Sequence, residues 1–211
     1  SFSRSLGQNS NGADEGTSVL AFSPAWYNRG RTPFDYRHVE FATLLWEIPF
    51  GHGRKFRPDA NRVLDAIAGG WNFTLTQQAR SGQPLSISGG YSNLGNGDGT
   101  RADLIGSPSI SNPSAAMWFN TAAFARPALY SWGSSPLGVL EGPGFLQFNT
   151  ALAKQFRVAE KKELQFRWEA FNAFNRVNYN NPSTNVASSQ FGKITSASSA
   201  RYMQLGLKFL F

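Results

Sequence analysis

The chain of 211 residues contains no cysteine, which excludes disulfide frameworks, thiol catalysis and metal sites with cysteine ligands. Long hydrophobic runs are also missing. No stretch approaches the ~18 apolar residues that a membrane-spanning helix requires, so the sequence argues against a helical membrane protein. Charge is scarce, since charged residues make up only 16% of the chain, against roughly a quarter in an average soluble domain. The apolar residues that are present are dispersed along the chain.

The basic residues are not clustered. The 20 Lys and Arg side chains outnumber the 13 Asp and Glu side chains, which gives a formal net charge of +7. The longest basic run is nevertheless the pair Lys161 and Lys162. A nucleic-acid-binding surface concentrates its cations on one element. The sequence therefore predicts no nucleic-acid partner.

Patterns for catalysis and metal binding are missing too. His38 and His52 are the only histidines, and neither has a second ligand at a metal-binding spacing. The carboxylates are scattered, so no acid–base pair is visible. The glycine-rich run 93–99 lacks the glutamate that ends a calcium loop, and we interpret it as a flexible loop. We expect a protein that is not an enzyme, with no catalytic residues, no metal and no cofactor.

What the sequence does contain is strict alternation of apolar and polar residues. In the last ten residues one strand face carries Met203, Leu205, Leu207, Phe209 and Phe211. The segment 163–170 repeats the pattern, with Leu164, Phe166, Trp168 and Ala170 opposite Gln165, Arg167 and Glu169. The segment 148–156 alternates as well, and the short polar connection 157–162 predicts a hairpin. Lys154 falls on the apolar face of this hairpin, near the strand end, where its stem is expected to extend toward water.

Further strands are predicted over 37–48 and over 71–77, the latter resuming through 85–87 after the break at 81–84. A weaker strand is predicted over 19–26. One short helix is expected at 61–68, with Asp59 as its N-cap and Gly69 and Gly70 as its stop. The sequence thus predicts about six strands, or up to eight if the connection 89–144 contains more, each near the ~10 residues of a tilted bilayer crossing.

Long and short connections alternate along the chain, as in outer-membrane barrels with long external loops and short periplasmic turns. Six strands are too few to close such a barrel, because the smallest bacterial examples have about eight. An open edge in lipid leaves backbone groups unsatisfied. We therefore predict an all-β fold: a segment of an antiparallel transmembrane β-barrel that is the last part of a larger barrel, with long external loops.

Aromatic residues are expected to form two girdles at the bilayer interfaces. The periplasmic group is Trp46, Phe50, Trp71, Phe156 and Phe211, and the external group is Tyr27, Phe148, Phe171, Phe174 and Tyr202. The competing interpretation is that these rings fill the core of a soluble, secreted, sugar-binding β-sandwich. Arg, Glu, Gln and Asn on the polar strand faces favour a water-filled lumen over that sandwich. A small self-contained barrel or adhesin-like structural protein remains a third possibility.

A set of short motifs occurs in an order that resembles the C-terminal barrel of TonB-dependent outer-membrane receptors. The motifs lie at 35–38 (DYRH), 48–51 (IPFG), 69–71 (GGW), 81–84 (SGQP), 101–104 (RADL), 118–120 (WFN), 142–144 (GPG), 171–175 (FNAFN) and 191–192 (FG). The subgroup it resembles is that of the Oar-like receptors, which carry an N-terminal carboxypeptidase-regulatory-like domain. The resemblance runs from about residue 33 to residue 211.

The resemblance implies a Gram-negative transporter of about 22 strands with a plug in its lumen, which imports a scarce nutrient with energy relayed by TonB. Residues 1–211 would then be the C-terminal part of the barrel domain, with the plug and N-terminal regions absent, located in the bacterial outer membrane. Contact with TonB would occur only through the missing regions, and the substrate is not specified. Outer-membrane lipid and lipopolysaccharide would be partners.

Two groups of site residues follow. The resemblance implies that the barrel-assembly machinery recognises the final strand through Met203, Leu205, Leu207, Phe209 and Phe211. In the long connection, aromatic rings beside amide and guanidinium groups suit a sugar or peptide ligand; the candidate residues are Trp118, Asn120, Arg126, Tyr130 and Trp132. The alternative is that these five residues pack the loop onto the barrel rim.

Overall fold

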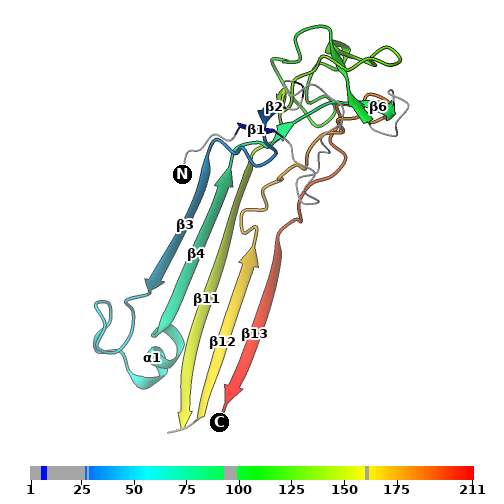
Figure 1. The fold of residues 1–211 in the computed structure, drawn as a ribbon. Coiled ribbons are helices and arrows are strands. Elements are labelled where there is room, and N and C mark those ends of the chain that lie inside the picture. Colours follow the sequence, from blue (N-terminus) through cyan, green and yellow to red (C-terminus); the bar gives the residue numbers. More distant parts are fainter. Residues whose placement is uncertain (1–5, 9–26, 28, 93–98, 160–161) are drawn as a thin grey trace. The chain divides into compact units, whose positions relative to one another are not determined.

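The computed structural model describes residues 6–8, 27, 29–92, 99–159 and 162–211, which are mostly strands and connecting segments (Figure 1). The helices are α1 (Arg62–Ala68) and the 3-10 turn η1 (Thr121–Ala123). The strands are β1 (Leu6–Gln8), β2 (Arg29–Arg31), β3 (Val39–Glu47), β4 (Trp71–Arg80), β5 (Pro84–Leu85), β6 (Ser88–Ser92), β7 (Gly99–Arg101), β8 (Asp103–Leu104), β9 (Phe124–Ala125), β10 (Leu140–Glu141), β11 (Phe145–Ala159), β12 (Lys162–Phe171) and β13 (Tyr202–Leu210). None of the described helices is long and apolar enough to span a membrane.

The chain divides into two compact units. The first, which we call the loop unit, comprises Ser1–Val39, Arg80–Phe145 and Asn178–Ser198. The second, the strand unit, comprises Glu40–Ala79, Leu146–Val177 and Ser199–Phe211.

Five long strands form one sheet in the order β3-β4-β11-β12-β13, so every strand lies beside its sequence neighbours among the five. Their directions alternate in Figure 1. The register aligns Leu152 with Trp168 and Trp168 with Leu205 across β11, β12 and β13. The predicted hairpin and C-terminal strand are thereby confirmed. The weaker strand expected over 19–26 lies outside the described residues.

The apolar face of the edge strand β13 is exposed rather than packed on a core. The side chains of Leu205 and Leu207 are 71% and 69% exposed, and every residue of β13 is classed as exposed. The opposite face carries ionised groups, since the Arg167 guanidinium lies 2.6 Å from the Glu169 carboxylate and the Gln204 amide donates to the same carboxyl group. An apolar face of this extent is a liability in water. In a bilayer it is the expected outer surface of a barrel wall.

The connections alternate in length as predicted. Residues 81–144 join β4 to β11, and residues 172–201 join β12 to β13, both from the same end of the antiparallel sheet. At the opposite end, residues 48–70 join β3 to β4, and two residues join β11 to β12. The assignment of these ends to the outside and the periplasm stays a prediction.

The expectation that β4 resumes through 85–87 is wrong. β4 runs unbroken to Arg80, and the next strand, β5, pairs with β10 instead. The chain turns away at Gly82, where the main chain approaches Gly142 so closely that a Cβ atom on Gly82 would lie 1.9 Å from the Gly142 carbonyl oxygen. Ile87 is then fully buried in the loop unit.

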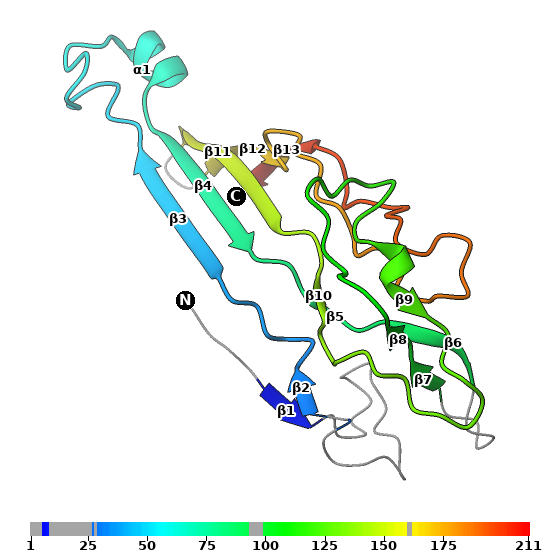
Figure 2. The ribbon, with the colours of Figure 1, turned by 90° about the horizontal axis from the view of Figure 1, so that it is seen from above.

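The loop unit has a hydrophobic core of its own. Ile87, Ala102, Phe119, Ala123 and Phe124 are buried together, and the ring of Phe191 packs edge-on against Phe119 at 5.2 Å between centroids. The short pairs β6–β7 and β8–β9 belong to this unit (Figure 2). The Arg101 guanidinium lies over the Tyr27 ring, 3.5 Å from the ring centroid. Burial lowers the pKa of Arg101. The described parts of the long connections are therefore packed structures.

Several predicted girdle aromatics do lie at strand ends. Trp71 begins β4, and Phe211 follows the last residue of β13. At the other end of the sheet, Phe171 and Tyr202 stack with ring centroids 4.6 Å apart. Their placement at bilayer interfaces stays a prediction.

The helix α1 is confirmed, but its predicted N-cap is wrong. The side chain of Asn61, not of Asp59, accepts the hydrogen bond from the Leu64 N–H, at 2.8 Å. Asp59 lies in a turn before the helix, two positions too early for its side chain to cap the first helical turn. At the other end, the Gly69 N–H donates to the Asp65 carbonyl, and Gly70 has a φ of 70°, as predicted for the stop.

We expect the substitution Asn61→Ala to destabilise α1 by about 1 kcal/mol, because the Leu64 N–H loses its acceptor. Hydrogen exchange of the Leu64 amide, measured by NMR or mass spectrometry, should accelerate several-fold. The substitution Asp59→Ala is the control and should leave that amide unchanged. Equal acceleration by both variants would contradict the assignment of the cap.

Candidate functional site

None of the five loop residues predicted to bind a ligand lines either of two cavities, of about 350 and 290 Å³, that the described residues form. The Trp118 indole N–H donates to the Glu141 carbonyl at 2.9 Å, and the Asn120 side chain caps η1. Trp132 packs on Tyr27, and Arg126 lies 5.7 Å from the Tyr91 ring. Tyr130 is 79% exposed. Trp118 and Asn120 thus have structural contacts, while a ligand-binding role of the group stays a prediction.

The five residues predicted for barrel assembly are all exposed and lie in β13 or directly after it. Met203, Leu205, Leu207 and Phe209 alternate along β13, and Phe211 follows directly after the strand. All are exposed, and the Phe211 ring stacks on Phe209 at 6.1 Å. Recognition by the assembly machinery stays a prediction.

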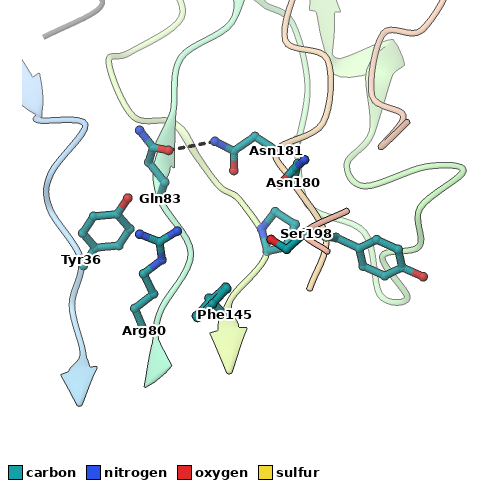
Figure 3. A pocket seen from close by; sticks show the side chains of 9 residues that line it. Tyr36, Arg80, Gln83, Phe145, Asn180, Asn181 and Ser198 are labelled. Carbon is teal, nitrogen blue, oxygen red and sulfur yellow. Dashed lines mark hydrogen bonds between the residues drawn. The ribbon is translucent and has the colours of Figure 1, made fainter. Parts of the chain in front are cut away.

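A different group of residues forms a cavity of about 350 Å³ in the loop unit (Figure 3). We call it the Arg80 pocket. It draws on four separate parts of the sequence. The lining residues are Tyr36, Arg80, Gln83, Pro143, Phe145, Tyr179, Asn180, Asn181 and Ser198.

A cation held between two rings is the main feature of the Arg80 pocket. The guanidinium carbon of Arg80 lies 5.1 Å from the centroid of the Tyr36 ring and 5.2 Å from that of Phe145. Arg80 is the last residue of β4, and Phe145 is the first residue of β11. Such contacts hold a guanidinium in place without neutralising it. Among the described residues, Arg80 has no carboxylate within ion-pair distance.

Amide groups form the second wall of the pocket. The Asn181 side-chain amide donates to the Gln83 side-chain oxygen at 2.9 Å (Figure 3), and the Asn180 amide donates to the Ser196 hydroxyl at 2.8 Å. Close backbone packing positions this wall. The Gly142 N–H donates to the Gln83 carbonyl at 2.8 Å, and a Cβ atom on Gly142 would lie 2.4 Å from the Asn181 side chain.

This arrangement suits the binding of a small, hydroxylated anion. A positioned guanidinium pairs with carboxylate or phosphate oxygens. Amide, hydroxyl and phenol groups hydrogen-bond to hydroxyl groups of a solute. No carboxylate lines the pocket to compete with an anion. In the described ranges, no group of three or more metal-binding side chains occurs either.

Comparison with known proteins places the chain among membrane barrels. A model of the outer membrane beta barrel domain matches residues 1–204. The chain belongs to this family. No curated protein and no solved structure matches the chain. The outer membrane beta barrel domain is located in the bacterial outer membrane, so the predicted fold class and location are confirmed and the soluble sandwich is excluded.

Sequence reasoning missed the Arg80 pocket of this outer membrane beta barrel domain, although the motifs contain part of it. Tyr36, Gln83 and Pro143 each belong to one of the motifs that carry the resemblance to TonB-dependent receptors. Nothing in the sequence indicated that these motifs meet. The backbone groups of the two histidines have structural contacts: His38 forms a bridge just before β3, and the His52 backbone N–H donates to the Asp65 carboxylate.

Proposed function

We propose that the chain is the C-terminal barrel part of a TonB-dependent, Oar-like receptor that imports a small anionic nutrient and is not an enzyme. The observation that carries this proposal is the open sheet. β3 and β13 each have a single strand neighbour among the five long described strands. Because unpaired edge groups in lipid cost several kcal/mol each, such a wall requires further strands to close it.

The polarity of the wall and the Arg80 pocket support a transport role. On the face opposite the apolar one, Glu169 contacts both Arg167 and Gln204, as suits a water-filled lumen. The pocket supplies a fixed cation and amide groups for an anionic solute. Lipid, lipopolysaccharide, the barrel-assembly machinery and, through other regions, TonB are the partners of this proposal.

The first experiment determines whether the chain is part of a larger receptor. An antibody against residues 99–145 should detect, in the outer-membrane fraction of the source bacterium, a protein several times heavier than these 211 residues. The periplasmic domain of TonB should retain that protein on a column. A heat-modifiable band at the mass of the 211 residues, not retained by TonB, would instead support a small self-contained barrel.

The pocket is tested by ligand binding to the purified full-length protein. We expect an anionic sugar such as galacturonate or glucose 6-phosphate to bind, and the substitution Arg80→Gln to weaken binding about tenfold through loss of the charge-assisted pair. Calorimetry measures both. The control Arg176→Gln removes an exposed cation from the β12–β13 connection and should leave binding unchanged. Equal affinity for neutral galactose, or no effect of Arg80→Gln, would contradict the anionic substrate class.

A further inference from the structure

Lys154 is a cation on the membrane-facing side of the sheet. The register places it opposite Phe166, in the same row of side chains as Trp168 and Leu152 on the apolar face. Its side chain is only 3% exposed, and its ammonium lies 4.9 Å from the Phe156 ring centroid. Charged groups facing lipid are costly and therefore rare, unless a partner or the interface receives them.

Within the described residues, Lys154 has a hydrogen-bond acceptor but no carboxylate in an ion pair. Its Nζ donates to the backbone carbonyl of Asp65 in α1, at 3.2 Å. The Asp65 carboxylate is engaged elsewhere, since it accepts the His52 N–H at 2.7 Å. In the part of the chain that the structure describes, neither Lys154 nor the nearby Arg62 forms an ion pair. Two cations thus remain available near one carboxylate.

The helix α1 exposes its apolar side, whereas a helix of a soluble domain buries that side. Its polar side, with Arg62 and Asp65, faces a cavity shared with Lys154. Its apolar side points away from that cavity, and Val63 and Ile67 are 69% and 67% exposed. A short helix with exposed apolar side chains and a basic flank is typical of a segment that lies in the membrane interface. Trp71, whose indole N–H donates to the Ile67 carbonyl, is of the residue type enriched there.

The cavity between helix and strand has a volume of about 290 Å³. We call it the Lys154 cavity. Its lining residues are Arg62, Asp65, Ala66, Gly69, Gly70, Lys154, Gln155 and Phe156. The lining carries two cations and one carboxylate, and Gly69 and Gly70 leave backbone rather than side chains along one side. It is open, lies beside the apolar face of the sheet, and is large enough for a phosphate group.

We propose that the Lys154 cavity binds the phosphate headgroup of a membrane phospholipid, whose acyl chains lie along the apolar face of the sheet. The membrane is the source of the ligand because the chain belongs to an outer-membrane family and because α1 exposes apolar side chains beside the cavity. Lys154 and Arg62 bind the phosphate, as basic pockets at membrane surfaces do. The cavity thereby fixes the end of the sheet that carries α1 at the level of the headgroups. The inference requires a membrane barrel but not a transport function.

The test measures lipid retained by the full-length protein. Native mass spectrometry of the protein in detergent, titrated with dioctanoyl phosphatidylglycerol, should show a bound lipid on the wild type. We expect the substitution Lys154→Gln to weaken this binding about tenfold and Lys154→Arg to restore most of it. The control Lys208→Gln removes a cation from the opposite face of the sheet and should change nothing.

Three other outcomes would overturn the proposal. Lipid binding that is equal in the wild type and in Lys154→Gln would exclude the Lys154 cavity as the site. Displacement of the lipid by millimolar inorganic phosphate, with equal binding of phosphate alone, would show a site for a free anion. If Lys154→Gln fails to insert, Arg62→Gln replaces it, because Arg62 is exposed and its loss leaves the fold intact. Unchanged lipid binding in that variant would also exclude the site.

Discussion

The substitution Leu205→Lys should destabilise the full-length barrel by about 3 kcal/mol, because a lysine at the middle of a lipid-facing strand must leave water. Leu205 lies near the centre of β13, on the apolar face, and is 71% exposed. In a soluble protein a substitution at such an exposed position usually changes stability by less than about 0.5 kcal/mol. Urea titration of the protein folded into phosphatidylcholine vesicles measures the difference.

The neighbouring substitution Gln204→Lys is the matched control. Gln204 lies on the opposite face of the same strand, where its amide donates to Glu169, so a lysine there remains in the lumen beside a carboxylate. We expect this variant to differ from the wild type by well under 1 kcal/mol. If both variants lose the same stability, the two faces are not lipid and water, and the orientation of the wall is wrong.

The long strands could be predicted because their signal is local. Alternation along 163–170 and 203–211 indicates which residues share a strand face. The register of β12 with β13 then puts the two apolar faces on the same side of the sheet. The antiparallel pairing of β11 with β12 followed from the short polar connection predicted at 157–162, and the structure leaves only two residues between these strands. Alternation did not predict how the long connections fold, because their apolar residues follow no regular period along the sequence.

The candidate sites could not be predicted for the same reason. The hydrogen bond between Gln83 and Asn181 joins residues 98 positions apart, and the contact of Lys154 with Asp65 joins residues 89 positions apart. The sequence placed Lys154 on the apolar face but predicted that its stem would extend toward water. The structure instead places α1 over it. Each site depends on a contact between segments whose local patterns say nothing about each other.

The cap of α1 is a smaller case of the same limit. Asp59 and Asn61 are both residue types that favour the N-cap. The choice depends on where helical backbone geometry begins, and Arg57, with a φ of 61°, is followed by a turn that contains Asp59. Only a position directly before the first helical residue can accept the Leu64 N–H. Residue type alone therefore left two candidates, and the backbone selected one.

Gly82 is the residue of the motif 81–84 at which the backbone packing requires glycine. Its Cα faces the Gly142 main chain, and a Cβ atom there would lie 1.9 Å from the Gly142 oxygen and 2.8 Å from the Glu141 side chain. Both strands of the β5–β10 pair begin or end at this contact. Because the obstacle is backbone, the two segments must separate to admit a methyl group. In the motif 142–144, a Cβ atom on Gly142 would instead meet the Asn181 side-chain oxygen, at 2.4 Å.

The substitution Gly82→Ala should therefore open the loop unit locally, at a cost of about 3 kcal/mol, the upper end of the usual range for overpacking. The hydrogen bond from the Gly142 N–H to the Gln83 carbonyl, 2.8 Å long, should be lost first. Exchange of the Gly142 amide is expected to accelerate roughly 100-fold. Because Gln83 and Asn181 line the Arg80 pocket, binding of the anionic sugar should fall together with amide protection.

The control is Gly106→Ala in the same unit, where a Cβ atom meets nothing closer than 3.7 Å and the added methyl should change stability little or raise it slightly. If Gly82→Ala accelerates exchange but leaves sugar binding intact, the close approach of Gly82 to Gly142 supports the loop unit without shaping the pocket. If both properties persist, the two backbones do not meet as described. If Gly82→Ala loses both amide protection and sugar binding while Gly106→Ala keeps them, the contact of Gly82 with Gly142 positions the Gln83–Asn181 wall of the Arg80 pocket.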